Sequence, residues 1–194
     1  EAVLRVEAGI NADVRTNGFQ HFNAVKMGYD GDSFTEITTD TGCSVHMRSK
    51  LYCDGAPMDE GEATGGRAFQ TLDTALEQGR KVVFRKLSVI TTDRDLEGGS
   101  MEERAKQHLT AALSKELYTE HAQVWEQRWK KADIEIEGDD HAQLAVRFAI
   151  YHMLRACNEL DDRVAICAKG FSGEAYFGHF FWNTEIYLLP LFLY

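Results

Sequence analysis

Positive charge is scarce in this sequence, which has 21 Lys and Arg residues against 31 Asp and Glu residues. The formal net charge of -10 argues against nucleic acid and anionic membranes as partners, because both are bound by clustered Lys and Arg side chains. No run approaches the roughly 18 consecutive apolar residues of a membrane span, and no charged-then-apolar leader opens the chain. The sequence therefore predicts neither a nucleic-acid partner nor a membrane partner.

Cysteine is also sparse and shows no useful spacing. The sequence has four cysteines, Cys43, Cys53, Cys157 and Cys167, and their spacing is not that of a zinc site. Four cysteines in a chain of 194 residues are also too few for a disulfide framework. We therefore expect no metal site and a reducing, cytoplasmic setting.

Residues 1–95 show the alternation of antiparallel β-strands. Cys43–Cys53 places apolar residues on one face and polar residues on the other, which predicts a half-buried strand with His46 on its solvated face. Ala68–Leu76 and Lys81–Thr92 read as two strands joined as a hairpin. Short strands with turn residues between them, and no alternation with helices, predict part of an antiparallel β-sandwich.

The pattern changes to helical after residue 95. Ser100 and Glu103 form a capping box, and a long helical pattern follows to about Lys131. A further helix begins at Asp139 or Asp140, with Gln143 completing a second capping box. This further helix is apolar over more than one face, which indicates packing on several sides, as in a bundle or a helical barrel.

The stretch Ala168–Pro190 (AKGFSGEAYFGHFFWNTEIYLLP) concentrates glycines and then aromatic residues beside amide and carboxylate groups. Such a mixture suits a sugar, whose C–H face stacks on a ring while its hydroxyls need polar partners. Aromatic clusters are more often core than site, so composition alone is a weak indication. The order of the residues is more specific than their composition.

That order resembles the signature of glycoside hydrolase family 65, the maltose, kojibiose and trehalose phosphorylases. The matching residues are Ala168, Lys169, Gly170, Gly173, Glu174, Tyr176, Gly178, His179, Phe181, Trp182, Thr184, Glu185, Ile186, Leu189 and Pro190. The resemblance implies part of an N-terminal β-sandwich over residues 1–95 and a helical linker over residues 96–138. Residues 139–194 would then be the first part of an (α/α)6 catalytic barrel.

The resemblance also implies a reaction, the inverting phosphorolysis of an α-glucosidic disaccharide to β-glucose 1-phosphate and a sugar. Inorganic phosphate is the co-substrate, and no cofactor is expected. The family's general acid is a Glu that falls beyond Tyr194, so no catalytic residue is assigned within this chain. We expect the chain alone to be inactive, to be an excerpt of a larger protein, and to form a homodimer in its full-length context.

Trp182 and Asn183 are the predicted substrate-binding residues. They fall on the Trp-Asp pair of the family signature, which binds the glucosyl unit. The sequence departs from the signature here, because Asn183 stands in place of Asp. It also has Phe177 in place of Arg and Ala175 in place of Gly.

Two other readings stay open from the sequence. One is an α-glucoside hydrolase of the acid trehalase type, which would differ by not needing phosphate. The other is a degenerate carbohydrate-binding member, a reading that Asn183 favours because an amide loses the charge-assisted hydrogen bond of a carboxylate. The glycosidic linkage and the acceptor sugar are open as well.

Overall fold

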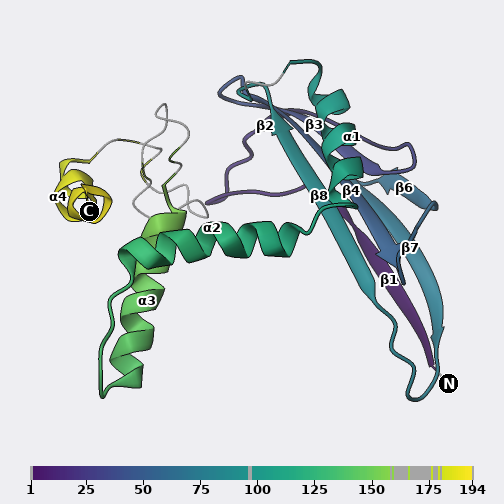
Figure 1. Cartoon of the computed structure of the whole chain (residues 1–194). Coiled ribbons are helices and arrows are strands. Elements are labelled where there is room, and N and C mark those ends of the chain that lie inside the picture. Colours follow the sequence, from purple (N-terminus) through teal and green to yellow (C-terminus); the bar gives the residue numbers. More distant parts are fainter. Residues whose placement is uncertain are drawn as a thin grey trace. The chain divides into compact units, whose positions relative to one another are not determined.

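The computed structural model describes residues 2–95, 98–157, 159, 166, 176, 179 and 181–193, without the side chain of Glu185. These residues fall into two compact units, Glu1–Lys115 and Glu116–Tyr194 (Figure 1). In the described residues all strands precede all helices, and every strand pair is antiparallel. Antiparallel sheets followed by helices are therefore confirmed. Closure of the helical part into an (α/α)6 barrel stays a prediction, as do the predicted boundaries at residues 95 and 138.

The first unit contains two sheets. The three-stranded sheet has the order β1 (Ala2–Asn11), β7 (Arg67–Leu76), β6 (Gly61–Thr64). The five-stranded sheet consists of β2 (Phe22–Tyr29), β3 (Ser33–Thr39), β4 (Ser44–Cys53), β5 (Ala56–Pro57) and β8 (Phe84–Thr92). Strand β4 is central because β3, β5 and β8 all pair with it. Strands β1 and β7 contact strands of the other sheet, so the two sheets pack on each other.

The packing between the sheets combines apolar side chains with one buried amide. Ile10, Leu51 and Phe69 are buried. The side chain of Gln70 in β7 is also buried, and its Oε1 accepts a hydrogen bond from the backbone N–H of Leu51 in β4 at 2.8 Å. A buried amide must be hydrogen-bonded to avoid a large desolvation cost. The Gln70 side chain therefore links β7 of one sheet to β4 of the other.

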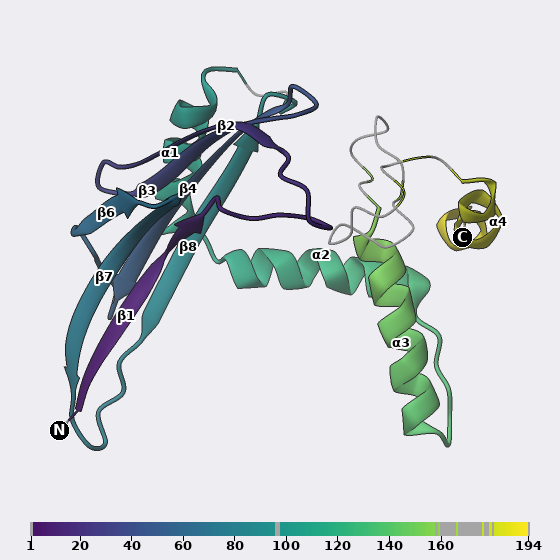
Figure 2. The same cartoon turned by 180° about the vertical axis from the view of Figure 1, so that it is seen from behind.

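The predicted hairpin of the last two strands is wrong. Strand β7 pairs with β1 and β6, whereas β8 pairs with β4 in the other sheet (Figure 2). Asp54 fixes the end of the β7–β8 connection, because its carboxylate accepts from the Val83 N–H at 2.9 Å and its own N–H donates to the Val83 carbonyl at 2.9 Å. The alternation predicted both strands correctly but carried no information on their partners.

The long helix predicted to reach Lys131 is two helices, α1 (Met101–Ala112) and α2 (Leu117–Ala132). The Ser100–Glu103 capping box at the start of α1 is present. The end of α1 is marked by the Ser114 hydroxyl, which donates to the Ala111 carbonyl at 3.0 Å and satisfies a helix-terminal acceptor. The apolar spacing that suggested one helix continues across this break.

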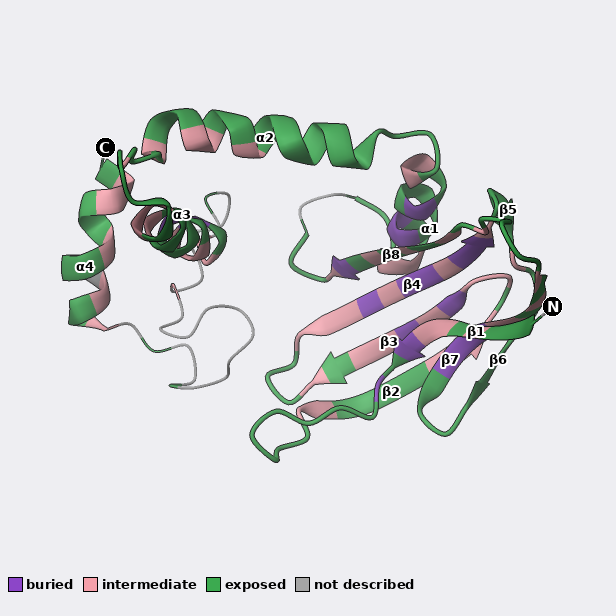
Figure 3. Ribbon diagram, turned by 90° about the horizontal axis from the view of Figure 1, so that it is seen from below, coloured by how far each residue is buried: buried purple, intermediate pink, exposed green. Residues whose placement is uncertain are grey.

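Helix α1 covers the polar face of β4. It contacts β4 and β8, and its residues Ala105 and Leu109 are buried (Figure 3). His46 and Arg48 are each only 1% exposed, so β4 is covered on both faces and the expectation of a solvated His46 is wrong. The cause is tertiary, because the sequence of β4 does not reveal that a later helix packs on this face.

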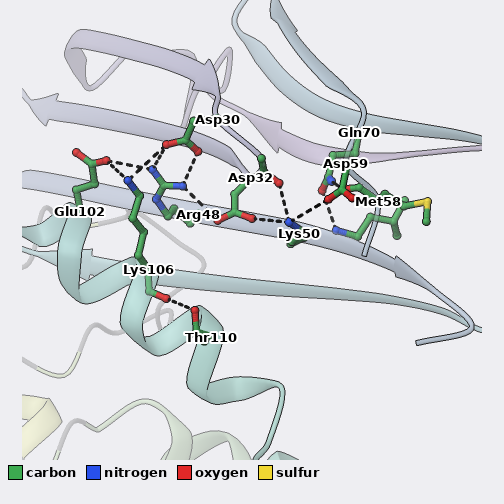
Figure 4. Close-up of polar contacts among 12 residues, drawn as sticks. Asp30, Asp32, Arg48, Lys50, Met58, Asp59, Gln70, Glu102, Lys106 and Thr110 are labelled. Atoms are coloured by element: carbon green, nitrogen blue, oxygen red, sulfur yellow. Dashed lines mark hydrogen bonds and ion pairs between the residues drawn. The ribbon is translucent and has the colours of Figure 1, made fainter. Parts of the chain in front are cut away.

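Arg48 is the centre of an ion-pair network beneath α1 (Figure 4). Its guanidinium donates to both carboxylate oxygens of Asp30 at 2.7 Å, and to Asp32 and Glu102 at 3.2 Å each. Lys106 of α1 adds contacts to Glu102 at 2.6 Å and Asp30 at 3.6 Å. The network thereby joins the β2–β3 turn, β4 and α1.

Asp30 should give this unit an acid-sensitive stability. The hydrogen bonds from Arg48 hold its pKa at about 2, against an ordinary value of 3.8. A lowered carboxylate pKa contributes stability that is present above pH 3.8 and is lost as the pH falls toward about 2. We expect hydrogen exchange of the α1 amides, measured relative to the intrinsic exchange rate at each pH, to accelerate over this interval. The acceleration should be smaller in Asp30→Asn, whereas Asp73→Asn, at an exposed ion pair, should behave as wild type. An unchanged pH profile in Asp30→Asn would contradict the assignment.

The second unit contains α2, α3 (Asp140–Arg155) and α4 (Trp182–Leu193). Asp139 caps α3 by accepting from the Ala142 N–H at 2.9 Å. Gln143 does not form the predicted capping box, because its amide instead bonds the backbone of Ile134 and Ile136. None of the helices within the described residues is long and apolar enough to cross a membrane.

Candidate substrate-binding site

Trp182 and Asn183 are the first two residues of α4. Both are exposed, and Trp182 retains 76% of its accessible surface. Successive residues of an α-helix point about 100° apart, so the indole and the amide present themselves to different parts of any ligand. The helix start also carries backbone N–H groups without partners inside the helix, which suit oxygen acceptors.

Three described residues that precede this helix, Tyr176, His179 and Phe181, contact one another. Tyr176 has a positive φ of 70°, an uncommon conformation for a residue with a side chain. Its carbonyl accepts from the His179 N–H at 3.0 Å, and its ring meets Phe181 edge-on with the centroids 5.2 Å apart. The Phe181 carbonyl in turn accepts from the Thr184 N–H at 3.1 Å. Phe181 thereby contacts both Tyr176 and the first turn of α4.

The side chains of Trp182 and Asn183 suit a sugar, which has an apolar C–H face and polar hydroxyls. An indole offers a flat apolar surface and one N–H donor, and the Asn183 amide offers two donors and one acceptor. No group of His, Cys, Asp and Glu within the described residues could hold a metal ion. Phe177, Ala175 and Glu174 lie outside the described residues. The predicted roles of Trp182 and Asn183 stay predictions.

A cavity of about 860 Å³ in this unit lies at the other end of α4. Its walls include Leu191 and Phe192 of α4, Val124 and Arg128 of α2, and Leu154 of α3. Trp182 and Asn183 do not line it. The predicted sugar-binding residues therefore lie on an open surface of the described part of the unit.

Sequence reasoning missed a second concave site, which lies within the first unit. A cavity of about 590 Å³ is lined by Lys50, Tyr52, Arg85 and Thr110 among others. Little in the sequence indicated this cavity. Lys50 and Tyr52 share a strand face with His46 and Arg48, and the sequence predicted that this face is exposed to solvent.

Two family models match this chain. Residues 1–128 match the glycosyl hydrolase family 65 N-terminal domain, and residues 147–194 match the family 65 central catalytic domain. The chain belongs to glycoside hydrolase family 65. Trp182 and Asn183 fall within the part that matches the catalytic domain of the family.

Relatives named as phosphorylases match most of the chain. A kojibiose phosphorylase of Halothermothrix orenii is 35% identical over 209 residues, which is 98% of this chain and 27% of the relative. A maltose phosphorylase of Bacillus subtilis is 32% identical over 145 residues, covering 71% of this chain and 19% of the relative. The chain thus spans about a quarter of the length of the kojibiose phosphorylase it matches.

A solved structure shares the fold. It is a human-microbiome protein assigned as a kojibiose phosphorylase, with a TM-score of 0.85 and 23% sequence identity. The similarity covers 99% of this chain and 26% of that chain. At this level of identity the structure supports the fold of the family 65 chain and not its substrate.

Proposed function

We propose that the complete protein containing this chain is a disaccharide phosphorylase that converts an α-glucosidic disaccharide and phosphate to β-glucose 1-phosphate and a sugar. The observation that carries the proposal is the match to two successive family 65 domains, over residues 1–128 and 147–194, with relatives named as phosphorylases. Trp182 and Asn183, at the exposed start of α4, would hold the glucosyl unit.

The chemistry assigned to the complete protein is a single displacement. A phosphate oxygen forms a bond to the anomeric carbon from one face while the glycosidic C–O bond breaks on the other. A carboxylic acid gives its proton to the departing oxygen, so the configuration at the anomeric carbon inverts. Phosphate is already anionic, so the reaction needs no second carboxylate to activate water. The acid belongs to the family's barrel, of which residues 139–194 would be the first part.

The proposal also covers the co-substrate, the oligomeric state and the cellular location of the protein. Inorganic phosphate is the co-substrate, no cofactor takes part, and the full-length protein is a homodimer in the cytoplasm. The sequence has only four cysteines, too few for a disulfide framework in a chain of 194 residues, which supports a reducing setting.

Phosphate dependence tests this proposal against the hydrolase alternative. The complete protein should cleave at least one of trehalose, maltose, kojibiose and nigerose when phosphate is present. NMR should show β-glucose 1-phosphate as the first product, because direct displacement inverts the anomeric carbon. Release of free glucose without phosphate would assign the protein to the hydrolases. Binding of these sugars without cleavage would favour a degenerate carbohydrate-binding member.

A further inference from the structure

The cavity beneath the C-terminal half of α1 has a charged floor. Tyr52 of β4 and Arg85 of β8 are direct cross-strand partners, and Lys50 precedes Tyr52 by two residues on the same face of the sheet. All three line the cavity of about 590 Å³, and Thr110 and Leu113 at the end of α1 line it too. Small-molecule sites typically have volumes of about 300–1,000 Å³.

The charge of Lys50 is already matched by its neighbours. Its ammonium donates to the Gly31 carbonyl at 2.9 Å and lies 3.3 Å from Asp32 and 3.6 Å from Asp59 (Figure 4). An ammonium has three donors, and these contacts account for them. Lys50 therefore shapes the floor of the cavity but offers little to a ligand.

Arg85 differs from Lys50 because no residue in the described part of the chain pairs with its guanidinium. A solvated surface arginine is the simplest reading of such a side chain. Two features favour a binding role: Arg85 lines a concave surface, and its cross-strand partner Tyr52, only 5% exposed, lines the same surface. Among the described residues none hydrogen-bonds the Tyr52 hydroxyl, and this oxygen is not one of the fully buried polar atoms, so a ligand in the cavity can reach it.

The two groups define the ligand that would satisfy them. A guanidinium presents parallel N–H donors that match two oxygens of a phosphate. Burial raises the pKa of Tyr52, so its phenol stays protonated at neutral pH and can donate as well as accept a hydrogen bond. The Thr110 hydroxyl donates to the Lys106 carbonyl at 2.9 Å and keeps its oxygen free to accept. Leu113 and Leu109 add apolar surface for C–H groups.

We propose that this cavity is a binding site for a phosphorylated monosaccharide. Arg85 holds the phosphate, Tyr52 and Thr110 hydrogen-bond sugar hydroxyls, and Leu113 packs on the ring. The site lies entirely within the first unit, outside the part that matches the catalytic domain. The proposal does not rest on the proposed reaction, because binding is measured without turnover.

Isothermal titration of the complete protein tests the site, with glucose 6-phosphate, inorganic phosphate and glucose as separate probes. Arg85→Gln should weaken glucose 6-phosphate binding about tenfold or more, the usual effect of losing a charge-assisted pair. Tyr52→Phe, which keeps the ring, should weaken it about threefold to tenfold. The matched control is Arg80→Gln, which removes the same charge from a residue that does not line the cavity.

The activity of Arg85→Gln on disaccharides should equal wild type, which separates this site from the one that cleaves sugar. Equal glucose 6-phosphate affinity in wild type and Arg85→Gln would overturn the proposal. Inorganic phosphate binding as tightly as glucose 6-phosphate, with the same loss in Arg85→Gln, would overturn the sugar part of it. Glucose binding that matches glucose 6-phosphate would overturn the role given to the anion.

Discussion

Arg48→Met in the complete protein should destabilise the first unit by about 2–4 kcal/mol. Arg48 is 1% exposed and is the shared partner of Asp30, Asp32 and Glu102. Methionine keeps much of the stem but leaves three carboxylates close together with only the lysines to balance them. The acids are partly solvated, which is why we expect less than the full cost of a buried unpaired charge.

Hydrogen exchange gives this prediction a local readout. Peptides from α1 and β4 should exchange faster in Arg48→Met, because Glu102 and Lys106 attach α1 to the network. Arg5→Met is the matched control, since Arg5 lies 3.7 Å from Asp73 in an exposed pair. Exposed pairs contribute about 0–1 kcal/mol, so the control should be close to wild type. Equal exchange in the two variants would show that the network does not stabilise α1.

Trp182→Ala in the complete protein should lower kcat/KM for the disaccharide about tenfold to a hundredfold, because a sugar loses an aromatic stacking surface. The Trp182 side chain is 76% exposed, so truncating it to alanine leaves no cavity in the core of the described part of the chain. Tyr118→Ala is a control at another highly exposed aromatic residue, 83% exposed at the start of α2. A kcat/KM of Trp182→Ala equal to wild type would show that the residue does not bind substrate.

Substitutions of Asn183 test the same site, because Asn183→Asp adds a negative charge there. Asn183→Asp should preserve or raise activity, because a carboxylate accepts a stronger hydrogen bond from a sugar hydroxyl than an amide does, by roughly 1–2 kcal/mol. Asn183→Ala should lower activity. An alanine variant as active as wild type would remove Asn183 from the site.

Local sequence signals predicted local structure well. Alternation predicted β4, and the Ser100–Glu103 spacing predicted the capping box of α1. The order of residues around Trp182, more than their composition, indicated the family that the domain matches confirm.

Three of the failures depended on contacts between residues distant in sequence. The partner of β8 was misassigned because alternation describes a strand's faces and not its neighbour. His46 was expected to be solvated because nothing in β4 indicates the helix that covers it. The cavity around Arg85 was missed for the same reason, since its walls come from β4, β8 and α1.

The register of β1 has a consequence for the order in which the chain folds during synthesis. Ala2 pairs with Leu76 and Asn11 with Arg67, so β1 lacks this hydrogen-bonding partner until β7 has left the ribosome. Strands β2, β3 and β4 are neighbours in sequence and can pair earlier, but β4 gains β8 only later and its polar face is covered only when α1 appears. In that interval the nascent chain has open strand edges, which promote misassociation. Folding of this unit therefore finishes with α1, and a ribosome stalled before Met101 would hold a sheet with Arg48 still uncovered.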